Sequence, residues 1–281
     1  MPTLTLVSGQ RRNNVRYPLP VPIIALLGVL ATVSLLLCTG CAGRAGSESL
    51  PQQLQPKYGS SATPVSSDHT YFQQPEHPAP DYWALSPFYL PQRNEYDCSA
   101  AAVAAVVNAL TRANRPLKET DRNASVASLL EAVTTARWAE RVQKQGIDGR
   151  VGLTLEQLAD VLMEALRLQG IPPPRIETVR VTADDPATRV AWRKALAANE
   201  ASADDIILIH FIQDTLTGAG GGPYPHISPI GAFDAVTDRA LVMDVDRDYY
   251  EPYWSPADMI VKAMAASTPQ YGHGGWIRVR R

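Results

Sequence analysis

The sequence has little cysteine and almost no net charge, and both shortages limit the classes of protein to which the chain can belong. Its 281 residues include three cysteines, Cys38, Cys41 and Cys98. These are too few for a disulfide-stapled fold and lack the paired spacing of a structural zinc site. The 26 Lys and Arg residues nearly balance 28 Asp and Glu residues, which disfavours nucleic-acid binding. With 45% hydrophobic and 19% charged residues, the composition predicts a globular protein.

Charge is absent between Arg16 and Arg44. Basic residues precede a nearly unbroken apolar run at residues 21–38, so residues 1–40 have the layout of an export signal. The run ends in Leu-Leu-Leu-Cys-Thr-Gly-Cys, which resembles a bacterial lipoprotein signal and predicts lipidation at Cys41. An uncleaved membrane anchor or a plain cleaved signal are the alternatives. Each version predicts that the rest of the chain lies outside the cytoplasm. The lipoprotein version also predicts that it is tethered to a membrane, as a periplasmic lipoprotein is.

Residues 41–85 are predicted to form a flexible tether. Pro, Ser and Gln are frequent in this stretch, and such a composition buries too little apolar surface to offset the entropy of ordering. His69 and His77 within it are expected to be solvated. Residues 86–281 are enough for one folded domain.

Helix and strand signals predict an α+β fold for this domain. The uncharged segment Cys98–Leu110 is rich in Ala and Val and predicts a buried helix with Asp97 as N-cap. Thr154 and Gln157 predict a capping box, and Pro256 the first position of a late helix. Further helices are expected at 125–134, 154–168, 187–198 and 256–266. Strands are expected at 206–212, 227–233, 240–245 and 276–279. Helices followed by strands favour an α+β domain over a doubly wound sheet.

Cys98 occupies a position that favours a reactive thiol. At the start of a helix, unpaired amide groups and the macrodipole stabilise a thiolate; spacing alone also allows a small buried apolar residue. His226 begins one expected strand and Asp244 lies near the end of the next, so the two can face each other as a base and its orienting carboxylate. Gln92 precedes Cys98 by six residues and can donate its amide to an oxyanion. Taken singly, a residue such as Gln92 is more often a solvated loop residue, and one such as Asp244 a turn or ion-pair residue. The order Gln, Cys, His, Asp, however, is that of papain-like thiol enzymes.

Longer segments around these positions carry a more specific pattern. They are Gln92-Arg-Asn-Glu-Tyr-Asp-Cys98, Val106-Val-Asn-Ala-Leu110, His226-Ile-Ser-Pro-Ile-Gly231, and Asp244-Val-Asp-Arg247 followed by Tyr250 and Trp254. Together they resemble the catalytic domain of phytochelatin synthases, the glutathione γ-glutamylcysteinyltransferases, in a short bacterial form. Weaker similarity continues through Gly152-Leu-Thr-Leu155 and Gly275-Trp-Ile-Arg-Val.

The resemblance implies a papain-like fold, a single catalytic domain at 86–281, and glutathione as the substrate. Cys98 would attack the carbonyl that joins cysteine to glycine, His226 would protonate the departing glycine, and γ-glutamylcysteine would remain as a thioester. Water would then complete hydrolysis, or a second glutathione would accept the acyl group and a phytochelatin would grow. Arg247 and Tyr250 match family positions near the substrate, with a surface ion pair and a core aromatic as the alternatives.

Two positions depart from the family pattern. Ser99 and Pro225 stand where the family usually has glycine, after the nucleophile and before the catalytic histidine, and a shifted substrate is one consequence to test. His210, inside an apolar strand, is expected to be a core or pocket histidine, and His273 lies in a glycine-rich loop. No protein metal site and no obligatory cofactor are expected. Heavy-metal ions such as Cd or Zn would act as metal thiolates of the substrate or as activators. No cysteine follows Cys98, so the Cys-rich region of the plant enzymes is not expected.

Two other functions fit parts of the pattern. Tyr96-Asp-Cys98 preceded by Gln92 also resembles bacteriocin-leader peptidases of the papain-like type. Those enzymes lack the Ser-Pro after the histidine and the Asp-Val-x-Arg run, so they rank second. A non-catalytic lipoprotein that captures thiol peptides or metal thiolates in a degenerate site is the third interpretation.

Overall fold

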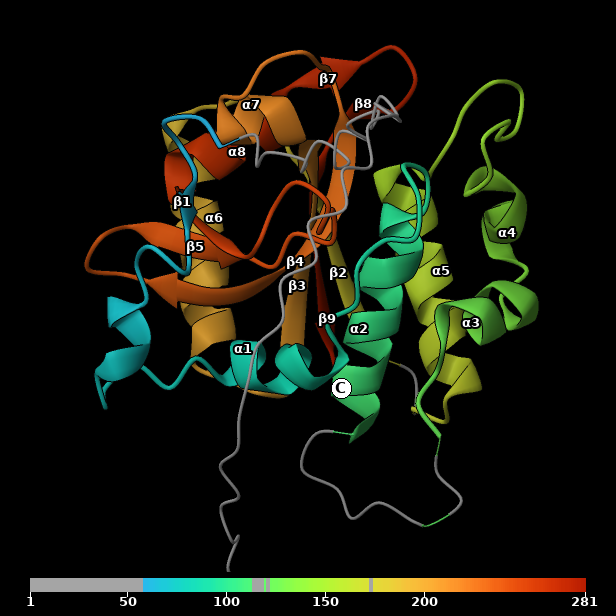
Figure 1. The fold of residues 1–281 in the computed structure, drawn as a ribbon, viewed down its shortest axis with the longest axis horizontal. Helices are drawn as coiled ribbons and strands as arrows, with labels where there is room; N and C mark the ends of the chain where they lie inside the picture. Colours follow the sequence, from blue (N-terminus) through green and yellow to red (C-terminus); the bar gives the residue numbers. More distant parts are fainter. Residues whose placement is uncertain (1–57, 113–118, 120–121, 172–173) are drawn as a thin grey trace, which may run out of the picture. The chain divides into compact units, whose positions relative to one another are not determined.

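A computed structural model describes residues 58–112, 119, 122–171 and 174–281 (Figure 1). All of them belong to one compact unit that extends over 50–281. The predicted export signal and the predicted lipidation at Cys41 lie outside the described residues and stay predictions. Within the described ranges, no helix is long and apolar enough to cross a membrane.

A seven-stranded antiparallel sheet forms the centre of this unit, in the order β1-β6-β5-β4-β3-β9-β2. Its strands are β1 (Thr63–Pro64), β2 (Arg175–Arg180), β3 (Asp205–Ile212), β4 (Pro225–Asp234), β5 (Arg239–Val242), β6 (Tyr253–Pro256) and β9 (Gly275–Arg280). A small second sheet pairs β7 (Ser267–Thr268) with β8 (Gly272–His273). Every residue of β3, and every residue of β4 after its first, is buried, so both faces of the sheet centre are covered.

Helices cover the two faces (Figure 1). They are α1 (Pro80–Leu85), α2 (Cys98–Arg112), α3 (Val126–Ala132), α4 (Trp138–Arg141), α5 (Leu155–Leu168), α6 (Pro186–Glu200), α7 (Gln213–Thr217) and α8 (Ala257–Ala265), with short 3-10 turns at Thr70–Gln73, Ser86–Phe88 and Thr135–Arg137. Side chains alternate along β3: Leu208 joins the core with α2 and α5, whereas Ile207 and Ile209 join the core with α6 and α8. This mixed arrangement confirms the α+β prediction, whereas kinship with papain stays a prediction.

Helix α2 places the thiol. The predicted helix is confirmed and continues to Arg112, with every residue from Ser99 to Thr111 buried. Its run of Ala and Val side chains packs in the same core as α1, α3 and α5, and small residues allow this close approach. Cys98 is the first helical residue and is partly exposed, so the thiol lies at the exposed start of an otherwise buried helix.

Several predicted boundaries are right and one is wrong. The capping box of Thr154 and Gln157 is present at the start of α5, and Gly170 after its end has the left-handed φ of +77°. Pro256, however, ends β6 and serves as N-cap, and α8 begins at Ala257. The reason is that Trp254 pairs with Leu241 in the sheet, which keeps the chain extended for longer than the helix signal suggests.

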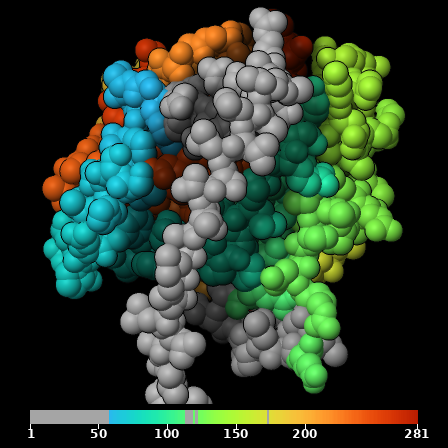
Figure 2. All heavy atoms as spheres, in the orientation of Figure 1, coloured from blue at the N-terminus to red at the C-terminus, as the bar shows by residue number. Residues whose placement is uncertain are grey.

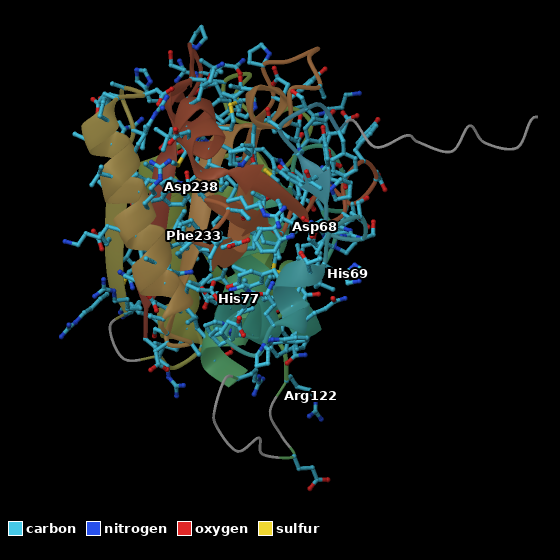
Figure 3. The ribbon with its side chains drawn as sticks, turned by 90° about the vertical axis from the view of Figure 1, so that its left-hand side faces the viewer. Asp68, His69, His77, Arg122, Phe233 and Asp238 are labelled. Atoms are coloured by element: carbon cyan, nitrogen blue, oxygen red, sulfur yellow. The ribbon has the colours of Figure 1, made fainter. Side chains whose placement is uncertain are left out.

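The predicted flexible tether is wrong for residues 58–85, which are folded onto the sheet. Tyr71 is 2% exposed, stacks on His77 with ring centroids 4.1 Å apart, and packs against Trp254. In Figure 2 this segment, blue to cyan, covers one flank of the face in view, and Figure 3 shows His77 and His69 on it. Aromatic side chains scattered among polar residues supply the buried surface that composition alone did not indicate.

Candidate active site

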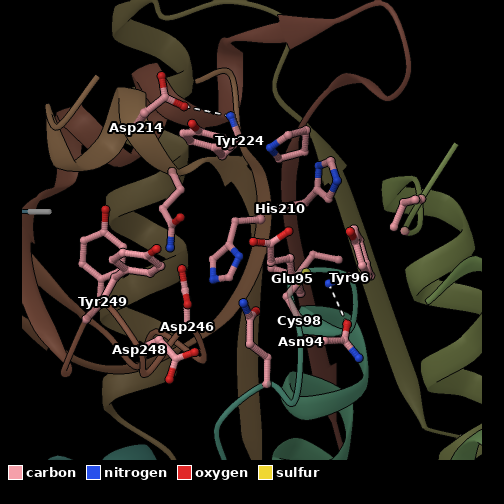
Figure 4. Close-up of a pocket in the computed structure, with 18 of the residues that line it drawn as sticks. Asn94, Glu95, Tyr96, Cys98, His210, Asp214, Tyr224, Asp246, Asp248 and Tyr249 are labelled. Atoms are coloured by element: carbon pink, nitrogen blue, oxygen red, sulfur yellow. Dashed lines mark hydrogen bonds between the residues drawn. The ribbon is translucent and has the colours of Figure 1, made fainter. Parts of the chain in front are cut away.

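A cavity of about 560 Å³ opens where α2 begins. Cys98 lies in its wall together with His226 from β4 and Gln92 from the loop before the helix. His210 from β3 and Tyr271 from the β7–β8 turn complete one side of it. Figure 4 shows Cys98 at the start of α2, near the strand that carries His210. Residues far apart in the sequence thus converge on one space.

The structure brings the three predicted triad residues together. His226 Nε2 lies 2.7 Å from Asp244 Oδ1, and both side chains are buried. The sulfur of Cys98 contributes to the raised pKa of the imidazole. Because Nε2 faces Asp244, Nδ1 is the ring nitrogen left for the thiol. A sulfur at a helix start, an imidazole and a carboxylate in this sequence can generate a thiolate and deliver a proton.

The antiparallel pairing of β4 with β5 aligns His226 and Asp244. The register shifts between Ile230 and Ala232, and β5 ends at Val242, so Asp244 follows the strand rather than ending it. Met243 N then donates to Pro229 O at 2.9 Å, which continues the pairing past the strand end. Backbone pairing, rather than the side chains alone, therefore sets the imidazole–carboxylate distance.

Asp244 is held by four donors. Oδ1 accepts from His226 and from the amide of Asp246 at 2.9 Å, while Oδ2 accepts from Gln213 Nε2 at 3.1 Å and Tyr253 Oη at 3.0 Å. Burial raises the pKa of this carboxyl, but the imidazolium and these hydrogen bonds outweigh it and lower the pKa below its ordinary value. Gln213 and Tyr253 were not predicted, because no local pattern distinguishes them from other polar or core residues.

His226 is poised to stay charged. Burial of the ring lowers its pKa, whereas the charge of Asp244 and hydrogen bonds with Asp244 and Cys98 raise it, and together they hold the pKa well above the ordinary value. The site therefore favours an imidazolium next to the sulfur. Such a pair attacks as a thiolate and supplies a proton to a leaving amine.

The loop before α2 places Gln92 at the same cavity. Gln92 N donates to Val245 O at 2.8 Å, which ties the loop to the chain just after Asp244. Its Oε1 is buried without a hydrogen-bond partner in the described residues, and Gln92 and Cys98 line the same cavity. With the first amide of α2, this group can form an oxyanion site.

The carboxylate of Asp97 orders this loop through hydrogen bonds. Its carboxylate accepts from the amides of Arg93 at 2.8 Å and Asn94 at 3.2 Å, and pairs with Arg93 Nε at 2.6 Å. Asp97 stands at the predicted N-cap position and its carbonyl accepts from Ala100 and Ala101. Its side chain, however, bonds upstream, because the turn before the helix presents two amides to it first. The residue orders the loop rather than the helix end.

The two predicted substrate residues have different surroundings. Tyr250 lines the cavity and packs edge-on against Tyr58, and burial raises its pKa to about 12. Arg247 lies outside the cavity wall: its guanidinium stacks over Tyr89 at 5.2 Å and donates to the hydroxyl at 3.2 Å. Since Tyr89 Oη in turn donates to Asp244 O, Arg247 supports the triad from outside.

The remaining histidines are separate from the triad. His210 is 3% exposed, lines the cavity, and has its pKa lowered to about 4, first by burial and then by Arg180. His273 Nδ1 bonds Ala265 O at 2.7 Å, away from the cavity. In the described part of the chain, no group of three His, Cys, Asp or Glu side chains is arranged to hold a metal ion.

Ser99, the residue after the nucleophile, has a partner of its own. Its Oγ accepts from Trp138 Nε1 at 3.0 Å, and both residues are fully buried. The hydroxyl therefore faces α4 and the core rather than the cavity. Pro225, in contrast, begins β4 and lines the cavity beside His226.

A thiol at a helix start, next to a buried imidazole that a carboxylate orients, is the catalytic arrangement of cysteine-dependent acyl-transfer enzymes. Residues 57–275 match the family model described as phytochelatin synthase. The chain belongs to the phytochelatin synthase family, which confirms the predicted resemblance. A stretch of 48 residues is 44% identical to a glutathione gamma-glutamylcysteinyltransferase 1 of Arabidopsis thaliana. That stretch covers 17% of this chain and 9% of the plant protein, so the chain matches only a small part of the relative's length.

Proposed function

We propose that this chain cleaves the Cys–Gly bond of glutathione through a thioester on Cys98. The thiolate adds to the carbonyl that joins cysteine to glycine, and the electron pair of the C=O bond moves to oxygen. When the tetrahedral intermediate collapses, the C–N bond breaks and the imidazolium of His226 gives its proton to the glycine amine. γ-Glutamylcysteine stays bonded to the sulfur. Gln92 and the first amide of α2 stabilise the oxyanion.

The observation that carries this proposal is that Cys98 and a buried His226 line the same cavity, with His226 Nε2 2.7 Å from Asp244 Oδ1. The family supplies the substrate class, since the Arabidopsis relative is named a glutathione gamma-glutamylcysteinyltransferase. A degenerate binding site would not need a carboxylate held by four donors to keep an imidazole charged. This favours an enzyme over a capture protein.

The thioester has two fates in the proposal. A water deprotonated by His226 releases γ-glutamylcysteine, or the amine of a second glutathione takes the acyl group and yields a phytochelatin. Heavy-metal ions enter as thiolates of the substrate or as activators rather than as ligands of the protein. Papain-like kinship of the fold and an export signal with lipidation at Cys41 complete the proposal, which places the reaction outside the cytoplasm at a membrane.

Mass spectrometry after brief exposure to glutathione tests the nucleophile and the substrate together. The expected result is a mass gain equal to a γ-glutamylcysteinyl group, that is γ-glutamylcysteine less one water, on the peptide that contains Cys98, with release of free glycine. Cys98→Ala should show neither. A mass gain on another residue, or glycine release by Cys98→Ala, would contradict the assignment.

The rival functions give different results in the same preparation. A leader peptidase would cut a Gly-Gly leader peptide and leave glutathione intact. A capture protein would bind glutathione without glycine release, and iodoacetamide would label Cys98 no faster than a free thiol at neutral pH. The proposed enzyme is expected to release glycine and to be labelled faster than free thiol.

A further inference from the structure

A second cavity, of about 260 Å³, adjoins the catalytic cavity. The two share Gly152 and Tyr271 as a common wall. The new cavity differs in charge from the first, because Arg141 and Arg150 both line it and Asp148 is the one acidic residue among its lining residues. A cavity with a net positive lining next to a reactive thiol is suited to an anionic part of the substrate.

Gly152 and Tyr271 form the wall that the two cavities share. Gly152 N donates to Arg141 O at 2.8 Å, which fixes the glycine next to the first arginine. Gly152 has a φ of +92°, and a Cβ there would lie 3.7 Å from the hydroxyl of Tyr271. Backbone without a side chain therefore separates the two spaces. Only the partly buried ring of Tyr271 stands beside it.

The pKa of Tyr271 depends on the charge of the nucleophile and on both arginines. Burial raises its pKa, the negative charge of Cys98 adds to the rise, and Arg141 and Arg150 oppose it. One phenol thus lies within electrostatic reach of the sulfur on one side and of two guanidinium groups on the other. Tyr271 lines both cavities, so an acyl group on Cys98 that extends past Tyr271 enters the second cavity.

Arg141 and Arg150 have N–H donors that a ligand can use. Arg141 Nε donates to Ala136 O at 2.9 Å, which orients the guanidinium. In the described residues, neither Arg141 nor Arg150 forms an ion pair with a carboxylate, although other arginines such as Arg180 and Arg189 do. Guanidinium groups bind carboxylates through paired N–H donors.

The opposite side of the catalytic cavity is acidic. Asp214, Asp246 and Asp248 line it, and Figure 4 shows them on the side away from Cys98, Tyr96 and a further acidic residue, Glu95. They follow Gln213 and Asp244, the residues that support His226. Because His226 protonates the leaving amine, the glycine lies on the side of Cys98 that faces His226. The acyl part then extends the other way, toward Gly152 and Tyr271.

We propose that Arg141 and Arg150 form a carboxylate-binding subsite for the acyl donor. The inference rests on the proposed function and deepens it. In glutathione the acyl part is γ-glutamylcysteinyl, and its one carboxylate is the α-carboxylate of the glutamyl residue. The subsite holds that group, so the donor lies with its glutamyl end toward Arg141 and Arg150.

Steady-state kinetics with two donors test the subsite: glutathione, and the analogue whose glutamyl α-carboxylate is an α-carboxamide. Arg141→Gln and Arg150→Gln should each raise the KM for glutathione about tenfold, with kcat changed less than about twofold, since a charge-assisted hydrogen bond is lost. For the carboxamide the wild-type KM should already be raised, and the variants should raise it no further. Arg141→Lys should recover part of the loss, because it keeps the charge.

Arg167→Gln is the matched control, because Arg167 is exposed in the last turn of α5 and lines neither cavity. It should leave the KM for both donors unchanged. If Arg141→Gln and Arg150→Gln raise the KM for acid and amide equally, or not at all, the subsite is wrong while the enzyme assignment stands. Circular dichroism of each variant excludes misfolding as the cause.

Binding separates this inference from the proposed function. Cys98→Ala with γ-glutamylcysteine, measured by calorimetry, needs no turnover. Weaker binding by about tenfold after Arg150→Gln, and no such change for the α-carboxamide, supports the subsite even if glycine release from glutathione fails. No binding of γ-glutamylcysteine to Cys98→Ala overturns it.

Discussion

At the scale of single residues, one carboxylate governs the chemistry of the site. Asp244 is fully buried, and His226, Gln213, Tyr253 and the amide of Asp246 all donate to it. These donors offset the loss of water around the charge. The carboxylate therefore stays ionised and in turn keeps the imidazole protonated, so the two charges depend on one another.

Asp244→Asn tests this dependence. An amide cannot stabilise the imidazolium, so the pKa of His226 should fall. Because a raised folded-state pKa keeps the ring charged until the pH passes it, the alkaline limb of kcat should move to lower pH in the variant. We expect kcat to fall about 10²- to 10⁴-fold. The pH profile of glycine release measures both effects.

The control for Asp244→Asn is Asp238→Asn, which removes a carboxylate that pairs with Arg193. Asp238 is not among the residues that line the catalytic cavity, so its pH profile should match that of the unchanged chain. An alkaline limb that stays in place in Asp244→Asn would mean that His226 does not owe its charge to this carboxylate.

Ser99 makes a second residue-scale prediction. In Ser99→Ala the buried Nε1–H of Trp138 loses its acceptor, and an unsatisfied buried donor costs about 1–3 kcal/mol. The free energy of unfolding in denaturant should fall by that amount. The double variant Ser99→Ala with Trp138→Phe removes both partners, so its loss should be smaller than the sum of the single losses. Additive losses would contradict a specific Ser99–Trp138 bond.

At the scale of elements, α1 and α6 are joined by a buried acid. Asp81 in α1 is fully buried and accepts a hydrogen bond from Asn199 in α6. Burial, together with the charges of Asp205 and Glu200, raises the pKa of Asp81 well above its ordinary value. The hydrogen bond from Asn199 opposes this rise but does not outweigh it. The folded chain therefore favours protonated Asp81, and the contribution of Asp81 to stability is lost as the pH rises through the raised pKa.

Asp81→Asn should accordingly stabilise the chain at neutral pH and change little at acidic pH. The neutral amide fits the same site without a buried charge, and the expected gain is about 1–3 kcal/mol at pH 7–8. Thermal or denaturant unfolding at pH 4 and pH 8 measures it. Equal effects at the two pH values would show that ionisation of Asp81 does not matter. Asp184→Asn, at an exposed ion pair with Arg189, serves as the control.

Elements with continuous local patterns were predictable from the sequence, and those defined by distant partners were not. The Ala- and Val-rich run after Cys98 and the Thr154–Gln157 box each specify a helix without help. Strand β2 (Arg175–Arg180) was missed because it is an edge strand with mostly exposed or half-exposed side chains. Strand β6 was missed because its four residues become a strand only by pairing with β5.

The same distinction holds for the site. Cys98 and His226 carry signals in their own neighbourhoods, a helix start and a strand start. Gln213 belongs to a short helix after β3 and reaches Asp244 across 31 residues, and no periodicity marks such a contact. Arg141 and Arg150 likewise come from a segment whose place beside the nucleophile depends on the packing of α5 against α2.

At the scale of the whole folded unit, the segment before α2 closes one edge of the sheet. Strand β1 pairs with β6, so the edge of the large sheet is formed by residues that the composition assigned to a tether. Asp68 accepts from Trp254 Nε1 at 3.0 Å through its carbonyl, and pairs with Arg239 through its carboxylate. Covering an edge strand also protects it from pairing with other chains.

Two truncations decide whether residues 58–85 are structural. A chain that starts at residue 58 keeps Tyr71 against Trp254 and the pairing of β1 with β6, and it should unfold at the same temperature as the full chain. A chain that starts at residue 86 exposes Trp254 and Leu241 and leaves Arg239 without Asp68.

Each large apolar side chain uncovered costs about 1.5–3 kcal/mol, and a domain has only about 5–15 kcal/mol to lose. We expect the shorter chain to aggregate or to unfold at least about 10 °C lower, and full-length Tyr71→Ala to show part of this loss. Equal melting temperatures for the two truncations would mean that the segment is a tether after all, since its contacts would then contribute nothing to the fold.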